Sequence, residues 1–289
     1  MDQIDILAFL LASLLHDIGH PGLNNEYQQN KQTKLALRYN DKSILENYHS
    51  YKGLRLFTKN SSNIIESFST EEKKIFRKRF IGCILATDMA NHNSVLSKLA
   101  SKIDKINIVN EFENQKSNQN LSGKGNEKHD ISRKYNRFSL EETDESLLLS
   151  QKRLKTFLEI DVDKENIQNQ KNQKFELQQD LLNFLVHSSD VSNPTKDLPV
   201  YSIWTKLVMQ EFFNQGTLEQ TENLPVSYLC DRNTTNVPKS QVGFIKFIVA
   251  PLFKTISFYL PSINFYEKNV MKNLDYFKCI EDFDIEYDI

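Results

Sequence analysis

An uninterrupted apolar run near the start of the chain, Ile6–Leu15, ends directly on His16 and Asp17. A run of this kind predicts a buried helix, which we expect to span Ile4–Asp17. The Pro-Gly pair at positions 21 and 22 ends helices, because proline lacks an N–H and glycine tolerates positive φ. The His-Asp pair is therefore expected at the rim of a hydrophobic interior. Imidazole and carboxylate groups in that position are suited to binding divalent metal ions.

Residues that interrupt helices are scarce elsewhere, since the 289 residues include only 8 Gly and 7 Pro. The alternation typical of strands hardly occurs, so we predict an all-α fold. Ser43, with Glu46 three residues later, matches a capping box at the start of one helix. The expected helices after the first are 34–39, 43–57, one that starts at Thr70 and runs towards Leu99, 175–187, 201–215, 240–260 and one within 263–289.

One long segment, residues 105–173, has a different character. It is rich in Asn, Gln, Lys, Ser and Glu and has no sustained apolar period. Such composition cannot bury enough apolar surface to offset chain entropy, so we predict that most of the segment is a disordered or loosely helical insertion. The expected organisation is one helical domain built from residues 1–104 and 174–282, interrupted by this insertion and followed by a tail, 283–289.

Charge and cysteine usage limit the partners of the chain. The formal net charge is −2 and the basic residues are scattered, which argues against nucleic-acid binding. Three dispersed cysteines, Cys83, Cys230 and Cys279, suggest free thiols in a reducing compartment. The first apolar run is shorter than the roughly 20 residues that span a bilayer, and acidic residues precede it. We expect a cytoplasmic protein without a transmembrane segment; the sequence does not indicate its oligomeric state.

Further polar clusters interrupt apolar runs, and each offers metal-binding side chains. Any single acid at a helix end is more often a cap than a ligand. Clusters that meet at one end of a helical bundle, however, would form a metal pocket. The clusters are His187 with Asp190, Thr87 and Asp88 with His92, and Asn40 and Asp41 with Glu46 and His49.

The combined pattern resembles the class I 3′,5′-cyclic nucleotide phosphodiesterases. The matching blocks follow one another across nearly all of the chain outside the insertion: HDIGHPGLNNEYQ (16–28), RYNDKSILEN (38–47), ILATDMANH (84–92), VHSSDVSNPTK (186–196), WTKLVMQEFF (204–213) and SQVGFIKFIVAPLF (240–253). The resemblance implies a compact multi-helix bundle of the cyclic nucleotide phosphodiesterase type. It also implies metal-dependent hydrolysis of a cyclic nucleotide to the 5′-monophosphate in signalling.

The resemblance implies a centre of two divalent ions, Zn²⁺ with Mg²⁺ or Mn²⁺. Two such ions can lower the pKa of a bridging water and clamp phosphoryl oxygens for in-line attack. The implied ligands are His16, Asp17 and Asp190, with Asp17 bridging. The implied catalytic residues are Glu46 and His20, which would hold metal-bound water together with Thr87, while His187 would support Asp190.

The resemblance also implies a purine site. An amide such as that of Gln241 can both donate to and accept from a purine edge. Phe244 would stack on the base, opposite Val208, although apolar helical residues often only fill a core. The rest of the implied wall is Asn193, Tyr201, Trp204, Thr205, Met209 and Phe212. Blocks 186–196 and 204–213 resemble the cAMP-specific branch, and 16–47 and 222–253 the cGMP-specific branch. We favour cAMP, with cGMP as the alternative.

One family motif is missing. Family members carry Tyr-His-Asn-x-x-His upstream of the His-Asp block, where one histidine is the general acid and the other a zinc ligand. No stretch of this chain matches it. We therefore expect weaker zinc binding and no proton donor for the leaving oxygen, a contribution typically worth about 10²–10⁴-fold in rate.

Three interpretations remain open. The chain is an N-terminally truncated phosphodiesterase, which we favour because every other block survives, or a non-catalytic nucleotide-binding homologue. Genomic sequence in frame upstream of Met1 discriminates between these two, since the missing motif would appear there in the first case. The third, another phosphohydrolase with a His-Asp pair, does not account for the block that holds Gln241 and Phe244.

Overall fold

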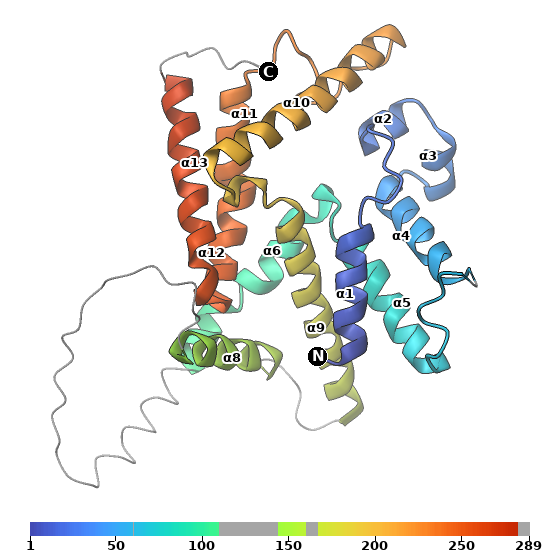
Figure 1. Cartoon of the computed structure of the whole chain (residues 1–289), viewed down its shortest axis with the longest axis vertical. Helices are drawn as coiled ribbons and strands as arrows, with labels where there is room; N and C mark the ends of the chain where they lie inside the picture. The colour runs from blue at the N-terminus through green and yellow to red at the C-terminus, as the bar shows by residue number, and fades with distance from the viewer. Residues whose placement is uncertain (60, 110–143, 160–166, 283–289) are drawn as a thin grey trace, which may run out of the picture.

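Every regular element in the described part of the chain is helical, which confirms the all-α prediction. The computed structural model describes residues 1–59, 61–109, 144–159 and 167–282. Figure 1 shows two groups of helices, with one long helix, α9, between them. The helices are α1 (Gln3–Leu15), α2 (Asn25–Asn30), α3 (Lys34–Tyr39), α4 (Ile44–Phe57), α5 (Thr70–Leu85), α6 (His92–Ala100), α8 (Asp144–Glu159), α9 (Ile167–Asp190), α10 (Leu198–Thr221), α11 (Val237–Phe244), α12 (Ala250–Tyr259) and α13 (Asn264–Asp282).

Helix α9 contributes to two hydrophobic cores at once. Leu181 and Phe184 enter the core that α6, α11, α12 and α13 share. Leu182 and Val186 enter the core formed with α1, α4 and α5. Residues three or four apart share one face of a helix, so these two pairs define two different buried faces of α9. The position of α9 is therefore fixed by both halves of the molecule.

Helix α1 lies against α5 and α9 through small side chains. Ala8 and Ala12 are one turn apart and fully buried. Opposite them, Phe57 packs edge-on against Phe76 and Phe80 with ring centroids 5.4 and 5.5 Å apart. Alanine side chains allow α1 to approach its neighbours closely, and the aromatic rings fill the space between α4 and α5.

Helix α1 ends slightly earlier than predicted. Its last residue is Leu15, and His16 still has helical φ and ψ as the C-cap. The chain then turns through Gly19, whose φ of +75° is strained for residues with a side chain. The turn precedes the Pro-Gly pair, so Gly19 directs the chain away from the helix axis before Pro21 is reached.

Several predicted helix boundaries differ from the observed ones, and one predicted cap does not form. Ser43 stands at the N-cap position of α4, but its backbone is left-handed (φ +41°) instead of extended, and its hydroxyl donates to Asp88 at 2.6 Å without capping the helix. The helix from Thr70 does not reach Leu99 but ends at Leu85, and a separate helix, α6, begins at His92. The break occurs because the carboxylate of Asp88 accepts from the backbone N–H of Ala90 and starts a new turn.

The predicted insertion, residues 105–173, includes residues that the structure shows to be part of the folded domain. Ile106 and Phe157 are fully buried in the core shared by α6 and α11–α13. Helix α8, which carries Phe157, packs against α9 and α12, and α9 begins at Ile167. The sequence pattern missed them because their apolar partners lie far away along the chain. Residues 110–143 and 160–166 of the insertion, and the predicted tail 283–289, lie outside the described residues.

A π-helical turn, Ile245–Val249, joins α11 to α12. Such turns are rare inside helices and occur often beside functional sites. The combined stretch Val237–Tyr259 is also long and apolar enough to cross a membrane by length and composition, which is weak evidence for a single helix. Ile245, Val249 and Leu252 of this stretch are fully buried in the core, as expected for a core helix.

We expect Phe157→Ala to lower the free energy of unfolding by about 3–5 kcal/mol, because it removes a fully buried ring from the core. Urea unfolding followed by circular dichroism measures this change. Leu148→Ala, on the exposed side of the same helix, is the matched control and should change stability little. Equal effects of the two substitutions would show that α8 is not docked as described.

Candidate metal centre and nucleotide site

The ends of α1 and α9 bring together the three predicted metal ligands. The Nε2 atom of His16 lies 3.4 Å from Oδ2 of Asp17 and 3.2 Å from Oδ1 of Asp190. His16 is the C-cap of α1, and Asp190 is the last residue of α9. Two residues adjacent in sequence and a third that is 173 positions beyond Asp17 therefore meet at one imidazole nitrogen.

The His16 ring is oriented by its own helix. Its Nδ1 atom donates to the carbonyl of Ser13 at 2.9 Å, which directs Nε2 towards the two carboxylates. The hydrogen bonds to Asp17 and Asp190 raise the pKa of His16 to about 11. Burial acts to raise the pKa of Asp17, but the hydrogen bond and charge of His16 outweigh it and hold that pKa below its usual value. The cluster therefore favours positive charge between its two carboxylates.

These donors fit a divalent cation in their chemistry. Within the described residues, no three His, Cys, Asp or Glu side chains already surround one point as a complete metal cluster. However, a histidine that donates through Nδ1 to a backbone carbonyl has its Nε2 lone pair available for a metal once that atom loses its proton. One imidazole and two carboxylates suit zinc, and carboxylate oxygens suit magnesium or manganese.

Glu46 and His20 lie on the neighbouring segments. Glu46 accepts two hydrogen bonds from the amide of Asn25, at 3.0 and 3.3 Å. Burial raises the pKa of Glu46 above its usual value. His20 accepts from the backbone N–H of Gly22 at 3.0 Å. Thr87 is buried and donates its hydroxyl proton to the carbonyl of Ile84 at 2.8 Å, which leaves the oxygen able to accept a bond.

His49 is a buried neighbour of the cluster that the sequence analysis did not assign. Its Nδ1 lies 3.5 Å from Oδ1 of Asp17, and its ring centroid lies 5.6 Å from that of His20. Neither ring nitrogen makes a hydrogen bond in the structure. Burial lowers the pKa of His49 to about 4, so the ring is neutral near pH 7. The sequence offered one indication of this role: His49 follows Glu46 by three residues, which places both side chains on one face of α4.

His187 bonds to His92 rather than to Asp190. The His187 Nε2 and His92 Nδ1 atoms are 3.0 Å apart, and both rings are buried. Burial lowers the pKa of both residues, so the bond joins two neutral rings, one of which donates. The sequence placed His92 in a polar cluster but gave no sign that it meets a residue 95 positions away. This bond ties the start of α6 to the last turn of α9.

The predicted nucleotide-binding residues are spread over α10, α11 and the turn before α10. Gln241 is buried, and its Oε1 accepts a 2.7 Å hydrogen bond from the hydroxyl of Tyr201. This bond fixes which end of the Gln241 amide presents its N–H₂ group. Thr205 and Met209 are buried, Asn193, Phe212 and Phe244 are half-buried, and Trp204 and Val208 are exposed on α10.

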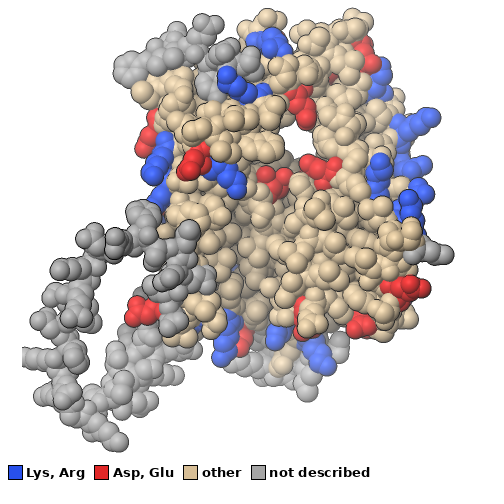
Figure 2. Space-filling view, in the orientation of Figure 1, with Lys and Arg blue, Asp and Glu red and all other residues tan. Residues whose placement is uncertain are grey.

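Figure 2 shows the molecule hollowed between α10 and the group formed by α1–α4. Acidic side chains lie at the rim of this opening, over the ends of α1 and α9. Beyond the opening, α2 meets α10 through polar side chains. The hydroxyl of Tyr27 donates to Glu222 at 2.9 Å, and the backbone N–H of Asn24 donates to Gln215 at 2.8 Å. The metal-type cluster therefore lies beside an opening that the two groups of helices share.

Comparisons with known proteins identify the family to which the chain is similar. Residues 1–270 match the family model described as 3'5'-cyclic nucleotide phosphodiesterase. A 3',5'-cyclic-AMP phosphodiesterase 4C of Rattus norvegicus is 32% identical over 253 residues, covering 88% of this chain and 37% of the relative. The 3',5'-cyclic-AMP phosphodiesterase isoform F of Drosophila melanogaster is 31% identical, covering 87% of this chain and 30% of the relative. The chain thus spans only about a third of the length of these relatives.

Solved structures extend the likeness to the fold. The phosphodiesterase domain of the RhoPDE fusion protein from the choanoflagellate Salpingoeca rosetta has a TM-score of 0.69 at 27% identity, covering 99% of this chain and 72% of that one. A structure of LmjPDEB1 in complex with IBMX has a TM-score of 0.68 at 20% identity, which bears on the fold alone. The family match spans most of the chain. The chain therefore belongs to the 3′,5′-cyclic nucleotide phosphodiesterase family.

Proposed function

We propose that this chain forms a metal-dependent phosphodiesterase domain that hydrolyses a 3′,5′-cyclic nucleotide to the 5′-monophosphate. The observation that carries the proposal is the meeting of His16, Asp17 and Asp190 at the ends of two helices. Family membership supports the same reaction class. The opening beside the cluster provides access for a substrate.

His16, Asp17 and Asp190 would hold two divalent ions, for which we propose zinc together with magnesium or manganese. When bound, such ions supply charge that stabilises the phosphoryl oxygens and a water of lowered pKa. Glu46 and His20 would orient this water. Burial raises the pKa of Glu46, so this carboxyl is better able than an exposed one to take up and hold a proton.

For the nucleotide we propose cAMP ahead of cGMP. The amide of Gln241, held by Tyr201, presents N–H₂ hydrogens to a purine acceptor such as adenine N1. The amide of Asn193 can pair with the N6 amine and N7 of adenine. Two relatives that are 32% and 31% identical are named as cyclic-AMP phosphodiesterases. Phe244 and Val208 would enclose the base between them.

A general acid for the leaving oxygen is not among the assigned residues, so turnover by this chain alone should be slow. Ile6, Leu10 and Leu14 form an exposed apolar stripe along α1. We propose that a segment carrying Tyr-His-Asn-x-x-His, packed against this stripe, would supply the proton donor. The competing proposal, a non-catalytic nucleotide-binding homologue, predicts that adding such a segment does not restore hydrolysis.

We also propose a reducing, cytoplasmic location. Cys83 and Cys230 are buried free thiols, and Cys279 is an exposed free thiol. Burial raises the pKa of Cys83 to about 12 and that of Cys230 to about 11, which keeps both thiols protonated and unreactive. Fluorescence microscopy of a tagged full-length protein tests the location.

Asp190→Ala should abolish metal-dependent hydrolysis while the fold stays intact, because it removes a carboxylate from the metal cluster. The measurement is cAMP hydrolysis with Mg²⁺ and Zn²⁺ by the chain extended upstream with the family motif, and circular dichroism monitors folding. Asp180→Ala is the matched control and should keep activity. It removes a carboxylate of the same helix that pairs with Lys98 and is not part of the cluster. Undiminished turnover in Asp190→Ala would refute its role as a ligand.

Gln241→Ala should raise KM roughly tenfold and leave kcat nearly unchanged, because it removes hydrogen bonds to the base and not to the phosphate. Steady-state kinetics on the extended chain with cAMP and with cGMP provide both values. Gln210→Ala, an exposed amide on α10, is the control. A loss of kcat at constant KM would contradict the role of Gln241 as a base contact.

The metal-free chain should lose stability as pH rises from about 6.5 to about 11. The folded-state pKa of His16 is raised to about 11, so its contribution is complete below the unfolded pKa and disappears as pH passes the folded value. Asp190→Asn removes one of the two causes of the raised pKa. Thermal unfolding from pH 6 to pH 10 should therefore show the difference in Tm between parent and variant shrinking with pH; a constant difference would contradict the linkage.

A further inference from the structure

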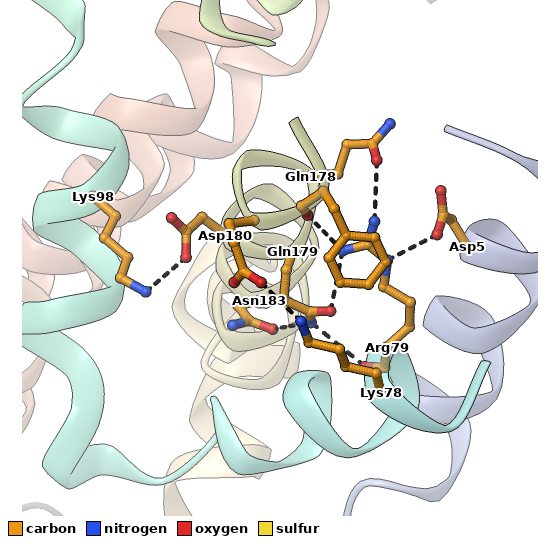
Figure 3. Close-up of polar contacts among 10 residues, drawn as sticks. Asp5, Lys78, Arg79, Lys98, Gln178, Gln179, Asp180 and Asn183 are labelled. Carbon is orange, nitrogen blue, oxygen red and sulfur yellow. Dashed lines mark hydrogen bonds and ion pairs between the residues drawn. The ribbon is translucent and has the colours of Figure 1, made fainter. Parts of the chain in front are cut away.

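A single buried guanidinium on α5 joins the two helices that carry the metal cluster. Arg79 is fully buried, and its Nε donates to Oδ1 of Asp5 on α1 at 2.8 Å. Its other nitrogens donate to three acceptors on α9: the carbonyl of Phe175 at 2.8 Å, Oε1 of Gln179 at 3.2 Å and Oε1 of Gln178 at 3.0 Å. Figure 3 shows Arg79 between Asp5 and these glutamines.

Two contacts of Arg79, one on each helix, lie equally far from the metal cluster. Asp5 precedes His16 by eleven residues, and Gln179 precedes Asp190 by eleven residues. Eleven residues are about three helical turns, or roughly 16 Å, and return to nearly the same face of the helix. Helices α1 and α9 are therefore joined at two levels, once through Arg79 and once where His16 meets Asp190.

We propose that Arg79 is a positioning residue that fixes the axial register of α1 against α9 and so the meeting of His16 and Asp17 with Asp190. The proposal rests on the proposed function of that cluster as a metal site. A shift of one helix by a single residue moves its end by about 1.5 Å. That distance is large beside the 3.2 Å contact between His16 and Asp190.

Apolar packing opposes voids, but on α1 it is less directional than the bonds of Arg79. The fully buried residues of α1 in this core are Ala8 and Ala12, which have short side chains, and larger side chains such as Leu7 and Leu11 are only partly buried against it. Hydrophobic contacts are non-directional. The guanidinium, in contrast, is a rigid planar donor whose bonds to acceptors on two helices are satisfied in one arrangement only. The ring of Phe175 also lies over it, with 3.5 Å from the guanidinium carbon to the ring centroid.

The buried ion pair between Arg79 and Asp5 is better explained by a role in positioning the helices than by a gain in the free energy of folding. Asp5 is also buried, and its second oxygen accepts from the backbone N–H of Asp2 at 3.0 Å. Well-packed apolar residues can often replace a buried ion pair without loss of stability, because desolvating two charges is costly. The ion pair supplies directional hydrogen bonds, which apolar residues lack.

The adjacent residue provides a matched control. Lys78 also joins α5 to α9, through a 2.8 Å bond to Glu176, and Figure 3 shows it next to Arg79. Its side chain is 58% exposed and that of Glu176 is 62% exposed. Solvent screens such a pair, and long exposed side chains tolerate small shifts of the helices. Lys78→Met should therefore leave the register of α1 and α9 unchanged.

The test measures Mn²⁺ affinity by isothermal titration calorimetry and Tm by thermal unfolding, on the chain as it exists. Arg79→Lys keeps the positive charge, but a lysine cannot reach the acceptors on both helices. The double variant Asp5→Leu with Arg79→Met removes both charges, so no unpaired charge is left buried. We expect both variants to fold and to bind Mn²⁺ about tenfold more weakly than the parent chain. Lys78→Met should bind as the parent does. Phe157→Ala, which lowers Tm far from the cluster, should also bind as the parent does.

Folded Arg79 variants that bind Mn²⁺ as tightly as the parent would overturn the proposal, as would an equal loss of affinity in Phe157→Ala. If the parent chain itself binds no Mn²⁺, the metal-site proposal fails, and crystal structures then test the register directly. A separation of His16 Nε2 from Asp190 Oδ1 longer in the double variant than the parent's 3.2 Å supports the positioning role, and an unchanged separation overturns it.

Discussion

Two carboxylates that converge on one imidazole nitrogen impose an electrostatic requirement on the whole site. Asp17 and Asp190 would repel each other across a partly buried space unless positive charge lay between them. In the metal-free chain His16 meets this requirement by keeping its proton, and its pKa rises to about 11. The need for positive charge between the two carboxylates connects the ends of α1 and α9. Any arrangement of the two helices that moves Asp190 away from His16 loses this charge compensation.

The same two helices are held along their lengths by packing of a different kind. Leu182 and Val186 of α9 face the core of α1 and α5, whereas Leu181 and Phe184 face the core of α11–α13. Moving α9 would therefore create voids in both cores, and close-packed interiors strongly oppose such voids. Asp190 of the cluster ends this shared helix, and the predicted nucleotide-binding residues follow it along the chain, in the turn before α10, on α10 and on α11. The packing of α9 therefore bears on the position of the cluster.

The sequence predicted what local patterns determine and missed what distant partners determine. The helix at Lys34–Tyr39 was predicted with its observed bounds, since Thr33 caps its first turn locally. Helix α8 was missed because Phe157 gains its partner, Tyr259, from more than 100 positions away, at 5.6 Å between ring centroids. The capping box at Ser43 failed because its backbone is left-handed and its hydroxyl donates to Asp88, 45 positions later. The apolar runs that end on His16, Asp17 and Asp190 indicated metal-binding side chains, the family resemblance implied that they are one ligand set, and their geometry came only from the structure.

Burial and the two carboxylates together determine which of four buried or partly buried histidines is protonated. His49, His92 and His187 all have pKa values lowered by burial, so these rings are neutral near pH 7. His16 is also partly buried, but the carboxylates on either side of its Nε2 reverse the direction. The four rings come from four different helices, α4, α6, α9 and, at its C-cap, α1, yet only that of His16 faces two acids. Of these four rings, His16 is therefore the one that carries positive charge, and a cation that binds Nε2 between the two acids has to displace the proton from that atom.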